Sequence, residues 1–235
     1  MRLLRHTADN RGVSPIAVVI PARDEQGRVG AVVKRVRSEA DGSTTSVYVV
    51  DDGSQDGTAA VAREAGARVL RHRVNLGKGA ALLTGAEAAV KAGAQLLVLM
   101  DADGQHDPGD LSRLLEPIQA GRADLVLGYR LFTREMPAAM RLGNTVLSGL
   151  FATLFGVTLR DTQCGYRAVT AKALGKLRWS ALDYAVETEM LVHAARAGLR
   201  IEEVPIATVY HDRYKGTTPV DGLRILANML RWRLA

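Results

Sequence analysis

The sequence predicts an α/β fold in which a mostly parallel β-sheet is flanked by helices on both faces. Between residues 16 and 127, apolar segments of strand length alternate with segments of helical periodicity. This alternation is typical of a parallel sheet whose strands are connected by helices. The chain has 235 residues, of which 47% are hydrophobic, so it can bury one large core. It contains no internal repeat, low-complexity tract or linker that would divide it.

The first half of the chain provides the alternation. Apolar, β-branched segments predict strands at residues 16–20, 47–50, 68–70, 96–100 and 124–127. Helical spacing between them predicts helices at about residues 29–40, 56–65, 77–92 and 110–120. Because ligands of open α/β sheets bind beyond the carboxyl ends of the strands, the loops that follow the strands are the expected site.

The pattern changes after Gly128. Helices are predicted at residues 137–155, 185–197 and 221–234, and strands at 164–169 and 201–210, where Pro205 interrupts the second. The apolar stripe of the 137–155 helix fits either core packing or a lipid-facing surface. The basic, amphipathic 221–234 helix likewise fits either an anionic membrane surface or docking on the core. We expect a flexible tail at 1–14, one domain at 15–218 and a C-terminal amphipathic helix at 219–235.

Composition narrows the class of partner and the compartment. The net charge of +6 favours anionic partners such as phosphates or an acidic membrane surface. No run of basic and aromatic residues resembles a nucleic-acid face, so we expect no nucleic-acid partner. The single cysteine, Cys164, excludes an internal disulfide and fits a reducing cytoplasm. We expect neither a signal peptide nor a transmembrane helix, since the apolar segment 142–159 is interrupted by polar and small residues.

Acidic residues follow the first, second and fourth predicted strands: Asp24 and Glu25, Asp51 and Asp52, and Asp101 and Asp103. Carboxylates gathered at one edge repel each other unless cations or hydrogen-bond donors lie among them. Asp101 and Asp103, one residue apart, suit a hard divalent cation that keeps waters and bridges phosphates. The alternative is helix capping, for which Ser54, Asp56, Asp103 and Asp107 are candidates.

A glycine-rich segment, Asn75-Leu-Gly-Lys-Gly-Ala80, opens the third predicted helix. Its glycines permit close backbone approach, and a helix N-terminus attracts anions. The segment is not a dinucleotide fingerprint, because that motif requires glycine at the position of Leu82. It is not a Walker loop either, because that motif requires glycine at the position of His72. The alternative is a helix start with a surface lysine, Lys78.

Ordered motifs along the chain resemble those of family 2 glycosyltransferases of GT-A fold, a Rossmann-like, mostly parallel sheet. The motifs are Pro21-Ala-Arg-Asp-Glu25, Asp51-Asp-Gly-Ser54, Asn75-Leu-Gly-Lys-Gly79, Asp101-Ala-Asp-Gly-Gln105 and Gly128-Tyr-Arg130. A later segment, Asp161-Thr-Gln-Cys-Gly-Tyr-Arg167, is similar to the branch of dolichyl-phosphate mannose synthases and polyprenyl-phosphate glucosyltransferases. The resemblance covers about residues 15–218.

The resemblance implies roles for individual residues. Asp101, Asp103 and Gln105 would hold Mg²⁺ or Mn²⁺, and Asp103, Arg130 and Glu189 would be the catalytic residues. The donor would be bound by Pro21, Arg23, Glu25, Asp52, Lys78, Asp101, Ala102, Asp103, Arg130, Arg213 and Lys215. The chain departs from the mannose synthases at Gly216-Thr-Thr-Pro219, where they often have Gly-x-Ser-Lys, and Lys215 is the candidate replacement.

The acceptor decides whether a general base is needed. A phosphate acceptor is already largely ionised near neutral pH, so it needs cations rather than a base, and Arg141 and Arg167 are assigned to it. A hydroxyl acceptor needs a base, for which Glu187 and Glu189 on a predicted helix are candidates, Glu189 the better by resemblance. The alternative for both glutamates is a solvated helix face.

We therefore expect an inverting, metal-dependent transferase that moves a hexose from a nucleotide-diphospho sugar, of GDP-mannose or UDP-glucose type, to polyprenyl or dolichyl phosphate. It would act as a cytoplasmic, peripheral protein at the inner face of the membrane, with a membrane-protein partner or a second copy as further expected partners. The alternatives are a transferase to a soluble hydroxyl acceptor, a nucleotidyltransferase, and a non-catalytic nucleotide-sugar-binding module.

Overall fold

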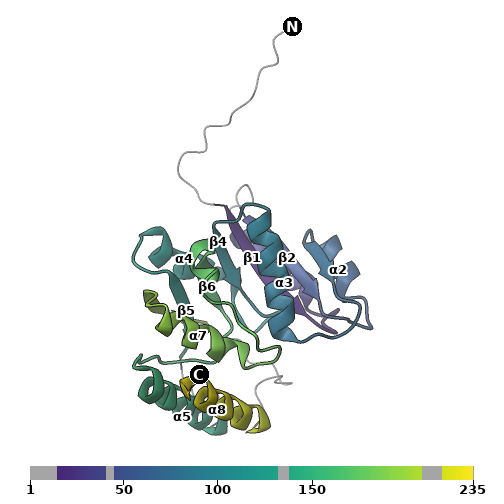
Figure 1. The fold of residues 1–235 in the computed structure, drawn as a ribbon. Coiled ribbons are helices and arrows are strands. Elements are labelled where there is room, and N and C mark those ends of the chain that lie inside the picture. Colours follow the sequence, from purple (N-terminus) through teal and green to yellow (C-terminus); the bar gives the residue numbers. More distant parts are fainter. Residues whose placement is uncertain (1–14, 41–44, 132–137, 208–218, 235) are drawn as a thin grey trace.

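The structure is a computed structural model that describes residues 15–40, 45–131, 138–207 and 219–234 (Figure 1). Its strands are β1 (Ile16–Ala22), β2 (Thr45–Asp51), β3 (Arg68–Arg71), β4 (Leu96–Leu99), β5 (Leu125–Arg130), β6 (Arg167–Thr170) and β7 (Ile201–Ile206). Its α-helices are α1 (Val29–Glu39), α2 (Thr58–Glu64), α3 (Lys78–Lys91), α4 (Leu111–Gln119), α5 (Ala138–Phe155), α6 (Ala171–Leu174), α7 (Val186–Arg196) and α8 (Pro219–Leu234). A 3₁₀ turn at Pro108–Asp110 precedes α4.

The described strands form one sheet in the order β3-β2-β1-β4-β6-β5-β7. Among them β6 alone runs antiparallel, to both β4 and β5, so the predicted mostly parallel sheet is confirmed. The predicted strand at 164–169 begins later, at Arg167, which leaves Cys164 and Gly165 in the preceding loop. Pro205 lies inside β7, where its missing N–H is tolerated because β7 is an edge strand.

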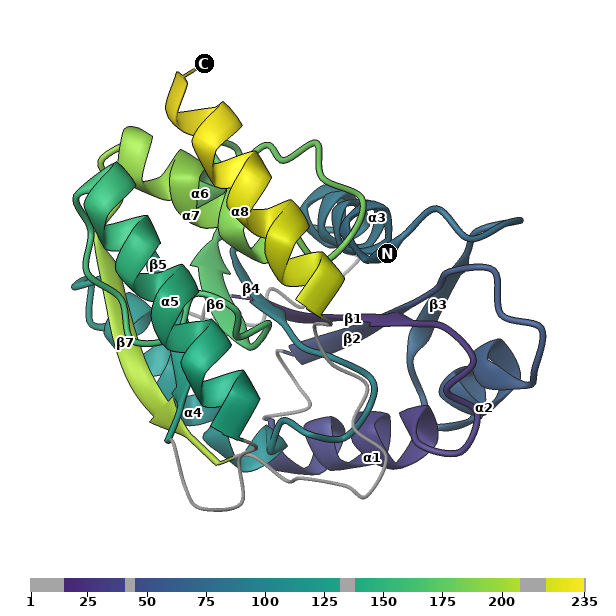
Figure 2. The same cartoon turned by 90° about the horizontal axis from the view of Figure 1, so that it is seen from below.

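Side-chain alternation along the central strands divides the core into two halves. Ile16, Val18 and Ile20 of β1 point into the half that α1, α2 and α4 cover. Ala17 and Val19 point into the half that α3, α5, α7 and α8 cover. Successive side chains of a strand point to opposite faces, so an apolar run such as β1 is required where both faces are buried. Figure 2 shows α3 on one side of the sheet and α1 and α2 on the other.

Helices α5 and α8 lie side by side in both views (Figures 1 and 2), and each packs partly on the core. Leu147 and Phe151 of α5 and Ile225 and Met229 of α8 are buried. Core packing therefore explains part of each predicted apolar stripe. The same helices also expose Leu142, Val146, Val220, Leu223, Leu230 and Leu234. Within the described residues, no helix is both long enough and apolar enough to span a bilayer.

Candidate active site

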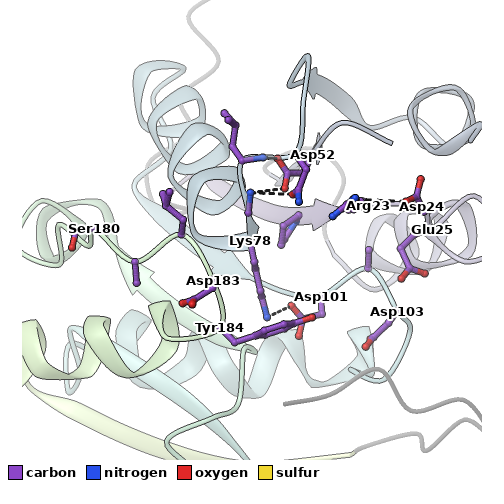
Figure 3. Close-up of a pocket in the computed structure, with 18 of the residues that line it drawn as sticks. Arg23, Asp24, Glu25, Asp52, Lys78, Asp101, Asp103, Ser180, Asp183 and Tyr184 are labelled. Carbon is purple, nitrogen blue, oxygen red and sulfur yellow. Dashed lines mark hydrogen bonds and ion pairs between the residues drawn. The ribbon is translucent and has the colours of Figure 1, made fainter. Parts of the chain in front are cut away.

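A cleft of about 880 Å³ opens beyond the carboxyl ends of β1, β2 and β4 (Figure 3). We call it the large cleft. It gathers eight of the residues that the sequence assigns to the donor: Pro21, Arg23, Glu25, Asp52, Lys78, Asp101, Ala102 and Asp103. Its opposite wall is made by residues 180–184 and by Asn228, Arg231 and Trp232 of α8. The predicted position of the site at the strand ends is therefore matched by a cavity of ligand size.

A three-membered charge cluster lies at the floor of the large cleft. The ammonium Nζ of Lys78 is 2.6 Å from Asp101 Oδ1 and 2.7 Å from Glu187 Oε1. Burial alone would lower the pKa of Lys78, but the carboxylates of Asp101 and Glu187 outweigh it and raise that pKa. Burial would likewise raise the pKa of Asp101, but the Lys78 ammonium holds it below its ordinary value. The alternative of a surface lysine at position 78 is therefore excluded, since the Lys78 side chain is only 17% exposed.

Asp103 lines the cleft beside this cluster, after a turn in which Gly104 takes a positive φ of 78°. Its Oδ1 accepts a hydrogen bond from the backbone N–H of Gln105 at 3.0 Å. Burial and the neighbouring Asp101 carboxylate raise the pKa of Asp103 to about 6. The Gln105 side chain is not among those that line the cleft.

The residues of the large cleft fit a metal ion for which protein side chains supply only some of the ligands. Asp101 and Asp103 both line the large cleft, while the described residues contain no cluster of three or more His, Cys, Asp or Glu side chains that could enclose an ion. Two carboxylates leave the remaining positions to water and to substrate oxygens, which is how Mg²⁺ is usually bound. The donor set therefore suits Mg²⁺ or Mn²⁺ together with a diphosphate.

Asp52 organises the glycine-rich segment. Its carboxylate accepts hydrogen bonds from the backbone N–H groups of Leu76 and Gly77 at 2.9 and 2.8 Å, and lies 2.7 Å from Nδ1 of His72. Gly77 has a φ of 99°, which favours glycine. The Asp52 carboxylate, which the resemblance assigned to donor binding, is thus held by internal hydrogen-bond donors, and it fixes the backbone that precedes Lys78.

The loop after β1 is fastened to the start of α2. The backbone N–H of Asp24 donates to Ser54 Oγ at 3.0 Å, and that of Glu25 donates to Thr58 Oγ1 at 2.8 Å. Asp24 has a φ of 53°, a region that aspartate tolerates better than most residues. Capping also occurs as expected at Asp56 and Asp107, which accept from the backbone N–H groups of Thr58 and Gly109. Part of the acidic pattern is therefore structural.

Both glutamates of α7 are buried, which excludes the alternative of a solvated helix face. Glu187 and Glu189 are 4% and 3% exposed. Glu189 accepts hydrogen bonds from the N–H and hydroxyl of Ser180 at 2.9 Å and from the N–H of Ala181 at 2.6 Å. It does not line the large cleft. This geometry supports a positioning role for Glu189, holding the wall of residues 180–184, rather than the catalytic role assigned to it.

That wall packs closely on the glycine-rich segment. The N–H of Gly79 donates to the carbonyl of Leu182 at 2.9 Å, and a Cβ on Gly79 would lie 2.0 Å from the carbonyl oxygen of Ala181. Gly165 is similarly confined, since its Cβ would lie 3.0 Å from Asp101 Oδ2 and 3.1 Å from Lys78 Nζ. Glycine at these positions is therefore what lets three distant segments meet around Lys78.

Arg130 lies outside the large cleft, in an ion pair with a buried carboxylate. Its Nε and Nη2 are 2.7 and 3.1 Å from the Asp161 oxygens. Burial would raise the pKa of Asp161, but the Arg130 guanidinium lowers it below the ordinary value. Arg130 also lines a second cavity of about 470 Å³, which we call the small cavity. The small cavity is bounded by Tyr129, Leu131, Thr145, Ser148, Gly149, Ala152, Thr158, Leu159 and Arg160.

The acceptor assignment of Arg167 is corrected by its burial. Only 1% of the residue is exposed, and its guanidinium donates to the carbonyls of Thr162, Cys164 and Glu187 at 2.6–3.0 Å. No face of it remains for a ligand. Arg141, on the first described turn of α5, is not among the residues that line either cavity. Arg213 and Lys215 lie outside the described residues.

Sequence reasoning missed three contributors: Gly165, the 180–184 wall, and the residues of α8. Gly165 lies within the Asp161-Thr-Gln-Cys-Gly-Tyr-Arg167 motif, but the motif does not indicate that Gly165 packs against Asp101 and Lys78. The wall and Asn228, Arg231 and Trp232 carry no local signal, since only the tertiary fold brings them to the cleft.

The α/β sheet presents an acidic, lysine-containing cleft at its strand ends, which is where open α/β sheets bind their ligands. Residues 17–174 match the family model described as glycosyl transferase family 2. The chain belongs to this family and is a glycosyltransferase. Its fold is the GT-A fold that the motifs predicted. Family membership disfavours the nucleotidyltransferase and binding-module alternatives.

Curated relatives match almost the whole chain. It is 30% identical over 244 residues to a UDP-N-acetylglucosamine–dolichyl-phosphate N-acetylglucosaminyltransferase of Methanococcus voltae, covering 93% of this chain and 96% of the relative. It is 33% identical over 227 residues to a polyprenol monophosphomannose synthase of Mycolicibacterium smegmatis, covering 91% and 84%.

A solved structure is similar in fold. Glucosyl-3-phosphoglycerate synthase from Mycobacterium tuberculosis, in complex with Mn²⁺, uridine-diphosphate-glucose and phosphoglyceric acid, superposes with a TM-score of 0.75 over 94% of this chain and 80% of that one. The two sequences are 24% identical, so the likeness establishes the shared fold alone.

Proposed function

We propose that the protein transfers a hexose from a nucleotide-diphospho sugar to a polyprenyl phosphate, with inversion at the sugar and with Mg²⁺ or Mn²⁺ as cofactor. The observation that carries the proposal is the large cleft, where Asp101 and Asp103 lie at the strand ends and the Lys78 ammonium contacts Asp101. The relatives of M. voltae and M. smegmatis, named for dolichyl phosphate and polyprenol, support this class of acceptor.

The donor side follows from the residues of the cleft. The loop after β1 and the segment fixed by Asp52 would enclose the nucleoside, while Asp101 and Asp103 would hold the metal against the diphosphate. When bound, the metal supplies a Lewis acid that stabilises the departing nucleoside diphosphate. Lys78, which lies beside Asp101, would add a positive charge there and stabilise the negative charge that develops as the glycosidic bond breaks.

The acceptor side is proposed at the small cavity. Arg130 lines the small cavity, and its positive charge also acts on the large cleft. Together with the stronger effect of Lys78, it lowers the pKa of Asp101. Arg160 lies at the small cavity with its guanidinium 4.7 Å from the centre of the Tyr129 ring. These arginines would neutralise an acceptor phosphate, whose ionised oxygen attacks without a general base. The remaining lining is largely apolar and would suit the first isoprene units.

The exposed surface of α5 and α8 suggests how the protein reaches a lipid acceptor. The exposed apolar side chains of α5 and α8 stand beside the exposed Arg224, Arg231 and Arg233. Arginine next to exposed leucine and valine suits the interface of an anionic membrane. We therefore propose peripheral attachment at the cytoplasmic face of the membrane, with a membrane-protein partner or a second copy of the chain as further expected contacts.

The metal-binding part of the proposal is tested by Asp103→Asn. The variant should lose transfer, because an amide is a poor ligand for a hard cation, while its far-UV circular dichroism stays that of the wild type. Asp107→Asn is the matched control: it makes the same change nearby, and asparagine still caps the turn, so activity should persist. Full activity of Asp103→Asn at saturating Mg²⁺ would contradict the metal assignment.

Transfer to a soluble hydroxyl acceptor is the second candidate. Its support is the exposed Asp183, a carboxylate that lines the large cleft. Asp183→Asn would abolish transfer if that carboxylate is the base, and would leave it nearly unchanged with a phosphate acceptor. Glu189→Gln tests the assigned base directly, with a thermal melt to separate catalysis from loss of the 180–184 wall.

A further inference from the structure

Lys78 pairs with the same carboxylate that the proposed metal requires. Its Nζ lies 2.6 Å from Asp101 Oδ1, the shorter of its two carboxylate contacts, and the side chain is only 17% exposed. Figure 3 shows the lysine reaching across the floor of the large cleft to Asp101. A cation that binds through Asp101 therefore meets an ammonium already in place.

Glu187 provides a second position for that ammonium. It reaches Lys78 from the first turn of α7 at 2.7 Å, is 4% exposed, and does not line the large cleft. Among the residues that the structure describes, its other oxygen, Oε2, is buried with no hydrogen-bond partner. A buried carboxylate oxygen without a donor is costly, so it is a ready acceptor for an ammonium that leaves Asp101.

We propose that Lys78 is the resident counter-ion of Asp101, and that it makes the binding of metal and nucleotide diphosphate interdependent. The diphosphate attracts Lys78, which stays anchored on Glu187, and Asp101 is thereby released to the metal. In the absence of diphosphate, the metal competes with the ammonium and binds weakly. Glu187 is then a positioning residue. The inference rests on the proposed function, because it assumes that Asp101 is a metal ligand.

The double variant Lys78→Met/Glu187→Gln isolates this effect. It removes one positive and one negative charge, so the net charge of the site is unchanged while Asp101 loses its partner. Binding of Mn²⁺ alone is measured from the free-ion signal in electron paramagnetic resonance, first without nucleotide and then with UDP or GDP. We expect Mn²⁺ without nucleotide to bind the variant about tenfold more tightly than the wild type.

The nucleotide dependence gives the second readout. In the wild type, UDP or GDP should strengthen Mn²⁺ binding about tenfold or more, and in the variant most of this enhancement should disappear. Lys91→Met is the matched control, since it makes the same substitution at the exposed end of α3 and should behave as the wild type. Lys78→Gln, which keeps a polar group against both carboxylates, is the second variant if the double variant does not fold, and the same loss of coupling is expected.

Two results would overturn the inference, and they are distinguishable. Equal Mn²⁺ affinity in wild type and variant, with the nucleotide enhancement intact in both, would show that Lys78 does not compete for Asp101 and would leave the proposed function standing. Failure of every protein to bind Mn²⁺, even with UDP and GDP, would overturn the metal assignment of the proposed function and this inference with it.

Discussion

Among single residues, the buried charged side chain of Arg167 connects segments that are distant in the sequence. Within the described part of the chain, Arg167 has no acidic partner at hydrogen-bond distance, and it donates instead to the carbonyl oxygens of Thr162, Cys164 and Glu187. It therefore joins the loop before β6 to the first turn of α7, the element that carries Glu187. A planar guanidinium with donors in a fixed fork suits this task better than an ammonium.

Replacing Arg167 should destabilise the fold. Arg167→Lys keeps the charge but cannot reach all three carbonyls, so we expect a loss of about 2–4 kcal/mol in the free energy of unfolding. Urea denaturation followed by circular dichroism measures it. Arg200→Lys is the control, because Arg200 pairs with Asp124 on the surface and should matter far less. Equal effects would contradict the structural role of Arg167.

The Asp161–Arg130 pair predicts how stability depends on pH. The pKa of Asp161 lies below its ordinary 3.8 in the folded protein, so the unfolded chain takes up the proton first on acidification. The contribution of the pair is complete above about pH 4 and is lost as the pH falls through the folded pKa. Asp161→Asn should be less stable at pH 7 and should lose less stability on acidification. Parallel acid-denaturation profiles of the two proteins would argue against the pair.

At the scale of elements, the first half of the chain was predictable and the second half only in part. Strict alternation of apolar runs and helical spacing located the segments from β1 to β5. Nothing local indicates that β6 inserts antiparallel between β4 and β5, because strand direction is set by the connections around it. In the sequence, the acidic residues of α7 resemble a polar helix face. Their partners could not be predicted, because Lys78 is distant in the sequence from Glu187 and the fold brings Ser180 to Glu189.

The contact between the glycine-rich segment and the 180–184 wall yields a test at this scale. Gly79→Ala would place a Cβ 2.0 Å from the carbonyl oxygen of Ala181, so the backbone must move. Because the segment carries Lys78, we expect donor affinity to fall about tenfold, or 1.4 kcal/mol, in calorimetry. Gly143→Ala on α5 is the control, since nothing lies within 4 Å of its Cβ. Unchanged donor binding in Gly79→Ala would contradict the proposed role of this contact.

For the whole molecule, charge and exposed apolar surface point to the same partner. The net charge is +6, and the apolar residues that remain exposed on α5 and α8 lie on neighbouring helices. The sequence left membrane contact and core docking as alternatives for both helices. The structure shows that part of each helix docks on the core, since Phe151 of α5 and Met229 of α8 are fully buried. The membrane contact stays a prediction.

Attachment to vesicles tests that prediction. The double variant Leu142→Asp/Leu223→Asp changes two side chains that are 68% and 67% exposed, so the fold should tolerate it. We expect its partitioning onto vesicles rich in anionic lipid to fall about tenfold in a sedimentation assay. Val90→Asp on α3 is the control for added charge at another partly exposed apolar position. Equal sedimentation of all three proteins would exclude this surface as the membrane contact.

The most direct test of the account is transfer into the lipid phase. The protein is incubated with Mn²⁺, a short polyprenyl phosphate and a panel of radiolabelled GDP- and UDP-sugars, and the lipid is then extracted. We predict label in the lipid phase for at least one donor, dependent on Mn²⁺ and absent with Asp103→Asn. The donor that gives this label would identify the base and the sugar. Donor consumption with all label remaining in the aqueous phase would contradict the lipid acceptor and favour a soluble one.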